Sequence, residues 1–193
     1  MSVRVGEQVP AVLADVEVFD TDGTTSRLGE RWAEGPAALV FLRHFACLAC
    51  TEHVTLLALR LHELTRLGVR VVYVGNGEPR YIEAFVERNA IDTAAVEVIT
   101  DPTLAAHRAL ELHRSFMETY GPRALWGLGR ALVGGFRQRG IEGDNYQQGG
   151  LVVVDAQQQV AYVHRDQATG DHAPLVDVIE AVMRVAAQGS PVV

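Results

Sequence analysis

The residues best suited to chemistry are two cysteines separated by two positions, Cys47 and Cys50, and they are the only cysteines of the chain. Residues 37–42 before them are six apolar residues without polar alternation, which indicates a strand buried on both faces. From Cys50 to Leu64 the apolar residues recur with helical spacing. The pattern predicts a strand, a tight loop and a helix, with Cys47 at the start of the helix.

This placement would activate Cys47. Unpaired N–H groups and the positive dipole end at a helix start favour a thiolate over a thiol. Arg43 and His44 are close in sequence and would add positive charge. Cys50 begins the apolar stripe, so we expect it to be more buried, and residues three apart on a helix can form a disulfide. The pair is interpreted as a reversible dithiol–disulfide centre in which Cys47 attacks and Cys50 resolves.

Simpler interpretations stay open at this point. Cys50 would also serve as a small apolar core residue, and His44 would also serve to satisfy a backbone group below the loop. His44, Cys47 and Cys50 are three potential zinc ligands, but a structural zinc site needs four, and His172 would have to complete the set. We therefore expect no metal and no cofactor. Four other histidines are expected at the surface: His53, His62, His107 and His113.

The composition is that of a single globular domain. The chain has 193 residues, of which 48% are hydrophobic and 21% charged. A net charge of −7 argues against general nucleic-acid binding. All 17 basic residues are arginine, which is typical of a GC-rich bacterial gene. No signal core or membrane-length apolar stretch occurs, so we expect a cytoplasmic protein, as a monomer or a homodimer.

Strands and helices alternate along the rest of the chain, which predicts an α/β fold. The expected strands are 12–19, 69–74, 96–100 and a hairpin of 151–155 with 160–164. A turn is expected at Asp20–Gly23 and a short helical turn at 28–32. The expected helices are the cysteine helix ending at Leu67–Gly68, residues 80–89, a helix capped by Asp101 with Pro102 in its first turn, and residues 173–187. In the last of these we expect Met183 to face inward with Val178 and Val182.

Residues 113–140 interrupt this alternation. They are rich in large apolar residues, and Arg123, Arg130 and Arg137 recur every seven positions, on one face of a helix. The first interpretation is a helical cap over part of the sheet. The second is a lid that holds an apolar, anionic substrate, with Trp126 and Arg123 as its contacts. A membrane-surface helix ranks third, because glycines weaken the helix.

Several motifs in order resemble one known family. They are G-E-Q-V-P at 6–10, D-T-D-G at 20–23, F-L-R-H-F-A-C-L-A-C at 41–50, D-P at 101–102, G-G-L-V-V-V-D at 149–155, and Y-V-H-R with G-D-H between 162 and 172. Together they resemble the peroxiredoxin-like branch of the AhpC/TSA (alkyl hydroperoxide reductase/thiol-specific antioxidant) family. The resemblance implies a thioredoxin-like fold over residues 1–193, with a central mixed sheet flanked by helices and a helical insertion at about 113–140.

The resemblance also implies an oxidoreductase, either a thiol peroxidase or a thiol-disulfide reductase. Its substrate would be a peroxide, an endoperoxide or a disulfide, and its reductant thioredoxin or a low-molecular-weight thiol. Two alternatives stay open. One is a specialised biosynthetic redox enzyme for a bulky apolar substrate held by residues 113–140. The other is a non-catalytic or metal-binding protein that uses His44, Cys47 and Cys50.

The chain departs from the family at the positions that activate a peroxide. Typical peroxiredoxins carry Pro-x-x-x-Thr-x-x-Cys, and here Val40 and His44 stand in place of the proline and the threonine. The arginine that usually precedes the strand at Leu151 is missing, because residues 147–150 are Gln-Gln-Gly-Gly. Gly150 is expected to line the substrate site.

The loop after the final hairpin is expected to supply a cation in place of the arginine that is missing before Leu151. In a thioredoxin-like sheet the last strand is parallel to the cysteine-bearing strand, so the loop after it would emerge beside Cys47. Arg165 and His172 are the candidates to face Cys47 there, with Asp171 orienting one histidine. The simpler interpretation is that Arg165 and Asp171 pair with each other to shape the loop.

Overall fold

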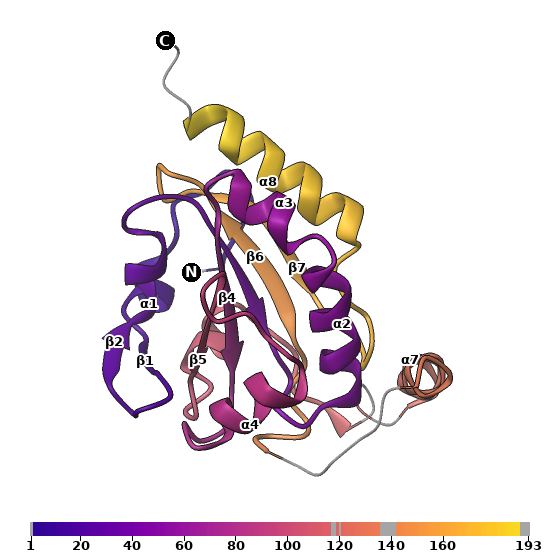
Figure 1. Ribbon diagram of the computed structural model, residues 1–193. Coiled ribbons are helices and arrows are strands. Elements are labelled where there is room, and N and C mark those ends of the chain that lie inside the picture. Colours follow the sequence, from indigo (N-terminus) through magenta and orange to yellow (C-terminus); the bar gives the residue numbers. More distant parts are fainter. Residues whose placement is uncertain (1, 117–118, 120, 136–141, 190–193) are drawn as a thin grey trace.

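The fold is built around a mixed sheet, seen in a computed structural model that describes residues 2–116, 119, 121–135 and 142–189, apart from the side chains of 122–124 and 127 (Figure 1). Its strands are β1 Glu17–Phe19, β2 Thr25–Arg27, β3 Ala37–Phe41, β4 Arg70–Gly75, β5 Val96–Thr100, β6 Gly150–Val154 and β7 Val160–Arg165. They lie in the order β2-β1-β5-β4-β3-β6-β7. The predicted α/β fold with a central mixed sheet is confirmed.

The cysteine-bearing strand β3 lies between β4 and β6. It is parallel to β4 and antiparallel to β6, with Phe41 opposite Gly150. Strand β7 is antiparallel to β6, with Arg165 opposite Gly150, so β7 is parallel to β3. The carboxyl ends of β3 and β7 therefore meet at one edge of the sheet, as predicted.

Helices cover both faces of the sheet (Figure 1). One face carries α2 Leu48–Ala58, α3 Leu61–Arg66, α4 Tyr81–Arg88 and α8 Leu175–Gly189, and the other carries α1 Ala11–Ala14, the 3-10 helix η1 Leu28–Trp32 and α5 Ala105–Ala109. Strand β3 serves both cores, since Ala38 and Val40 point to the first face and Ala37, Leu39 and Phe41 to the second. This double burial explains its uninterrupted apolar sequence.

Three predicted elements have different bounds. The expected strand at 12–19 is a short helix, α1, followed by β1, because Leu13 turns into the core while Val12 stays exposed. The single cysteine helix is two helices, α2 and α3, with Leu59 exposed at the break, although the apolar stripe still buries Leu64.

The third difference is at Asp101. Its carboxylate accepts N–H groups of Thr103 and Ala106, at 3.0 and 2.7 Å, and so stabilises a turn before the helix. Leu104 then adopts a left-handed φ of 62°, and α5 begins only at Ala105. In α8 Met183 is exposed instead of inward, and Val178, Val182 and Val185 form the buried stripe.

The insertion contains a helix, α7 Pro122–Val133, which confirms a helical insertion within 113–140. It packs against α2 rather than over the sheet, with Ala131 buried (Figure 1). Arg130 holds this contact through two bonds to the carboxylate of Glu52, at 3.0 and 2.9 Å. Among the described residues, no helix has both the length and the apolar character that a membrane crossing requires.

Candidate active site

The two cysteines lie at the start of α2, as predicted. Cys47 is the N-cap residue, and its Sγ accepts the backbone N–H of Cys50 at 3.4 Å. Cys50 lies in the first helical turn, and the two residues approach to 3.3 Å. Both are free thiols and both are buried, Cys47 with an exposure of 1% and Cys50 with 3%. A local strand, loop and helix thus bring both sulfurs together without help from distant chain segments.

The surroundings make the two thiols chemically unequal. The thiol of Cys50 hydrogen-bonds to Cys47 and, together with the charge of Arg43, holds the pKa of Cys47 well below its ordinary value despite burial. Burial and the neighbouring Cys47 raise the pKa of Cys50 well above its ordinary value. The arrangement therefore favours the thiolate form at Cys47 and the thiol form at Cys50.

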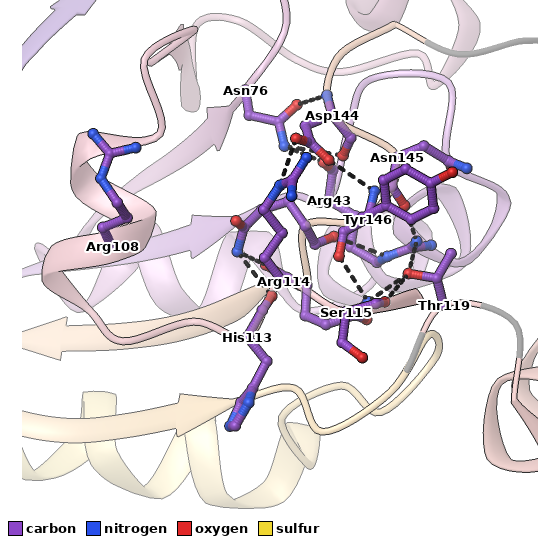
Figure 2. Close-up of polar contacts among 12 residues, drawn as sticks. Arg43, Asn76, Arg108, His113, Arg114, Ser115, Thr119, Asp144, Asn145 and Tyr146 are labelled. Atoms are coloured by element: carbon purple, nitrogen blue, oxygen red, sulfur yellow. Dashed lines mark hydrogen bonds and ion pairs between the residues drawn. The ribbon is translucent and has the colours of Figure 1, made fainter. Parts of the chain in front are cut away.

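Arg43 is the cation in contact with this thiolate. Its Nη1 donates to the Sγ of Cys47 at 3.4 Å, and its backbone N–H donates to the Sγ of Cys50 at 3.3 Å. The guanidinium also donates to the carbonyls of Gln147 and Asn145, at 3.1 and 2.7 Å, so it is fixed in place (Figure 2). Only 3% of Arg43 is exposed, and little solvent screens the ion pair.

Asn76 positions this arginine, and sequence reasoning missed it. The Asn76 side-chain amide donates to the carbonyl of Arg43 and accepts the N–H of Asp144 at 3.0 Å (Figure 2). It follows the carboxyl end of β4, next to β3, which is where polar residues of an α/β sheet gather around a site. That position, directly after a buried strand, was the only signal available in the sequence.

His44 is placed beside Cys47 but is not a second strong cation. Its ring is completely buried, and burial lowers its pKa although the charge of Cys47 acts in the other direction. A neutral imidazole is therefore favoured near pH 7. Arg43 then supplies most of the positive charge that the sequence predicted for this loop.

The expectation that Arg165 faces Cys47 is wrong. Its guanidinium donates to the carbonyls of Leu110 and Val3, at 2.6 and 2.7 Å, and lies 3.8 Å from the carboxylate of Glu111. Side chains alternate along a strand, so Arg165 points to the face opposite His164 and Asp166. Its ion partner is also Glu111 instead of the predicted Asp171.

The loop after β7 nevertheless brings a histidine to the site. His172 is nearly buried, and its ring stacks on that of His53 in α2. Burial is the largest influence on its pKa and acts to lower it, but Asp166 and, after it, the charge of Cys47 raise the pKa of His172 above its ordinary value. The carboxylate beside His172 is that of Asp166, at 3.6 Å, whereas the predicted Asp171 contacts the other histidine, His164, through its backbone carbonyl at 3.3 Å. His53 and His107 were expected at the surface and are buried, whereas His62 and His113 are exposed, as expected.

The remaining predicted contacts differ in their exposure. Gly150 is buried between strands, and a Cβ there would stand 2.6 Å from the carbonyl oxygen of His164, so it admits the neighbouring backbone. Trp126 is 79% exposed on α7. The Arg123 side chain and Arg137 lie outside the described residues. In the described part of the chain, no three His, Cys, Asp or Glu side chains are arranged to hold a metal ion.

Comparison with known proteins gives a family match over part of the chain. Residues 56–168 match the family described as AhpC/TSA antioxidant enzyme, which is more than half of the chain. The matched stretch begins after the two cysteines, so the match itself does not cover them.

Curated relatives are similar over most of this chain. The thioredoxin-like protein AAED1 of Arabidopsis thaliana is 27% identical, covering 92% of this chain and 74% of that protein. Human peroxiredoxin-like 2C is 27% identical, with 92% and 81% covered. The prostamide/prostaglandin F synthase of Salmo salar is 26% identical, with 83% and 80% covered.

A solved structure shows the same fold. The peroxidoxin BcpB of Mycobacterium tuberculosis superposes with a TM-score of 0.65 at 16% identity, covering 97% of this chain and 99% of that one. This likeness concerns the fold, and the family match covers most of the sheet. The chain therefore belongs to the AhpC/TSA antioxidant enzyme family, and it is an oxidoreductase of the thiol peroxidase type.

Proposed function

We propose that the protein reduces a peroxide through the Cys47–Cys50 pair. The observation that carries the proposal is the inequality of the two thiols, since Cys47, whose pKa is held well below its ordinary value, contacts both Arg43 and the thiol of Cys50, whose pKa is raised. A thiolate is the nucleophile in peroxide reduction, and a neighbouring thiol can resolve the product.

The reaction takes place in two steps. In the first, the sulfur of Cys47 attacks one oxygen of the peroxide, an S–O bond forms, the O–O bond breaks, and the departing oxygen takes up a proton. Cys47 is now a sulfenic acid and the peroxide has become an alcohol or water. In the second step, the sulfur of Cys50 attacks that of Cys47, a disulfide forms, and water leaves with the hydroxyl of Cys47 and the proton of Cys50.

The geometry favours the second step within one helical turn. The two residues are already 3.3 Å apart, and a disulfide requires about 2.0 Å between sulfurs. A dithiol reductant such as thioredoxin, or two molecules of a low-molecular-weight thiol, would then return the pair to its reduced state. We place this cycle in the cytoplasm, in a monomer or a homodimer.

The experiment that tests the proposal is intact-mass analysis after one equivalent of hydrogen peroxide, followed over seconds. Rapid loss of two hydrogen atoms, with both thiols lost to alkylation, is expected. A protein that keeps both thiols for minutes would contradict peroxide reduction by this pair. A stable gain of oxygen on Cys47 would contradict the resolving role of Cys50.

A second candidate function is reduction of a bulky apolar substrate. Helix α7 exposes Leu125, Trp126, Leu132 and Val133, and one relative is named for prostamide and prostaglandin F synthesis. Exposed apolar side chains in contiguous groups often mark binding sites. Because α7 packs on α2, a substrate held by α7 would lie near the helix that carries the cysteines.

Substitution of Trp126 separates the two candidates. If α7 holds the substrate, Trp126→Ser should raise KM for cumene hydroperoxide about 5- to 20-fold, because the indole ring would no longer pack against the bound substrate. The rate with hydrogen peroxide should be unchanged. Val12→Ser, which removes an exposed apolar side chain on α1, is the control. Equal kinetics of Trp126→Ser and the control would remove α7 from substrate binding.

A further inference from the structure

A largely buried cluster of four ionisable side chains lies at the edge of the sheet where β3 ends, and the peroxide chemistry above does not use it. Asp166 is at its centre, with 4% of its side chain exposed. The carboxylate lies 3.5 Å from Nε2 of His164 and 3.6 Å from Nδ1 of His172. The ring of His172 stacks on that of His53, with centroids 4.4 Å apart and an angle of 13° between the planes.

The sheet places this cluster at the edge where Cys47 lies. Strands β3 and β7 end together on the two sides of Gly150, and the N–H of Asp166 donates to the carbonyl of Gly149 at 3.1 Å. A Cβ on Gly149 would stand 2.5 Å from the carbonyl oxygen of Phe41 and 2.9 Å from Oδ2 of Asp166. Glycine at this position therefore lets the carboxylate approach the end of the cysteine-bearing strand.

Only one of the two stacked imidazoles can readily carry a proton. Two parallel imidazolium rings at this distance would repel each other, and both are buried. Asp166 lies 3.6 Å from His172 and raises its pKa, and the negative charges of Cys47 and Glu52 act in the same direction. Arg130 neutralises Glu52 from α7. Burial lowers the pKa of His53, and the charges of His172 and His164 lower it further, so the proton belongs on His172.

We propose that Asp166 and His172 form a buried ion pair that stabilises the Cys47 thiolate and releases a proton when that thiolate is oxidised. The proposal rests on the function proposed above, in which Cys47 is the attacking sulfur. His172 is a positioning residue here, because it acts on Cys47 through its charge. Asp166 keeps that charge inside the protein, where an isolated imidazolium would be unfavourable.

The proton balance of the first step supports this role. Thiolate, peroxide and imidazolium give sulfenic acid, alcohol and neutral imidazole, so the proton that His172 releases to solvent offsets the proton that the departing oxygen takes up. Coupling between two sites is reciprocal. The negative charge of the thiolate raises the pKa of His172, and the positive charge of His172 lowers the pKa of Cys47 by the same amount. When the thiolate is oxidised, its charge is lost and the pKa of His172 falls.

The first test compares the reduced protein with Cys47→Ser by NMR, following the ring Cε1–Hε1 signals of the histidines against pH. The His172 signal is assigned by its loss in His172→Gln. We expect the titration midpoint of His172 to be lower in Cys47→Ser than in the wild type, because the thiolate is missing. Identical midpoints would overturn the proposal. No peroxide is used, so the result is independent of whether the pair reduces peroxides.

The second test is the pH profile of Cys47 alkylation by iodoacetamide in Cys50→Ser protein. His172→Gln should move the profile to higher pH and slow alkylation about 3- to 10-fold on its acid side, with the same rate at the alkaline plateau. His62→Gln, which changes an exposed histidine, should leave the profile in place. A His172→Gln profile that coincides with the control would also overturn the proposal, whereas damage to the fold would change the plateau.

Discussion

Cys47→Ser is expected to reduce peroxide consumption to the background rate, a loss of roughly 1000-fold or more, because a serine hydroxyl at its ordinary pKa cannot replace a thiolate nucleophile. The sulfur is 1% exposed and packed, and serine is slightly smaller, so the fold should be kept. The rate is measured with hydrogen peroxide in excess and a thiol reductant present. Full activity of Cys47→Ser would show that another group attacks the peroxide.

Cys50→Ser should fail at a different point. It leaves Cys47 able to react once, so one equivalent of peroxide should add one oxygen atom to the protein without loss of two hydrogens. Serine also keeps a hydroxyl that can donate to Cys47, in place of the Cys50 thiol that lowers its pKa. Cys50→Ala removes this donor, so its first step should be slower than that of Cys50→Ser on the acid side of the pH profile. Equal first steps would argue that the thiol of Cys50 does not tune Cys47.

The cysteine motif was predictable because its geometry is local. A strand, a tight loop and a helix start are encoded within residues 37–64, and hydrophobic periodicity identifies each of them. The inequality of the two thiols also follows from this stretch, since Cys47 is the N-cap, Cys50 lies on the apolar stripe, and Arg43 is four positions before Cys47. No distant contact is needed for these conclusions.

The supporting residues were not predictable for the opposite reason. Asn76 bonds to Asp144, 68 positions away, and His107 contacts the carbonyl of Leu42 across 65 positions. A histidine with such a partner can be buried, but neither the partner nor the burial is visible in a single sequence. These residues follow strands or lie on short helices, where sequence periodicity carries little information.

The error at Arg165 has a specific cause. The relative direction of β3 and β7 was predicted correctly, so the loop after β7 was correctly placed at the edge of the sheet where β3 ends. The direction of each side chain depends on strand register, which a one-residue change inverts. Residue 165 points to the α1 and α5 face and its neighbours His164 and Asp166 to the other. The end of β7 and the loop after it therefore contribute a carboxylate, Asp166, and histidines to this edge of the sheet, whereas the arginine that contacts Cys47 comes from the loop after β3.

This division predicts a large difference between two arginine substitutions. Arg43→Met removes the cation that contacts Cys47, whose pKa should rise toward its ordinary value. A group with a lowered pKa is charged above that pKa and loses its charge as the pH falls through it. The thiolate of the variant is therefore lost at higher pH, and alkylation of Cys47 near pH 6 should slow by about 10- to 100-fold. At alkaline pH, where both proteins are fully ionised, the rates should converge.

Arg165→Met is the matched control, since it removes the same side chain from the same edge of the sheet. Its guanidinium donates to the carbonyls of Leu110 and Val3, and within the described part of the chain it makes no hydrogen bond to either sulfur. Loss of these bonds should lower the free energy of unfolding by about 1–3 kcal/mol and leave the pH profile of Cys47 unchanged. If Arg165→Met shifted the profile as much as Arg43→Met, the pKa of Cys47 would depend on the summed positive charge at this edge of the sheet and not on direct contact with Arg43.

Arg43→Lys distinguishes charge from geometry at the same position. Lysine keeps the positive charge but has one nitrogen, whereas Arg43 donates at once to Cys47, Gln147 and Asn145. The lysine variant should restore part of the lowered pKa while losing stability, because the two carbonyls compete with the sulfur for one ammonium group. If Arg43→Lys and Arg43→Met had the same pH profile, positive charge alone would not lower the pKa of Cys47. The orientation of the guanidinium, which the loop at 145–147 and Asn76 fix, would then be what makes Cys47 reactive.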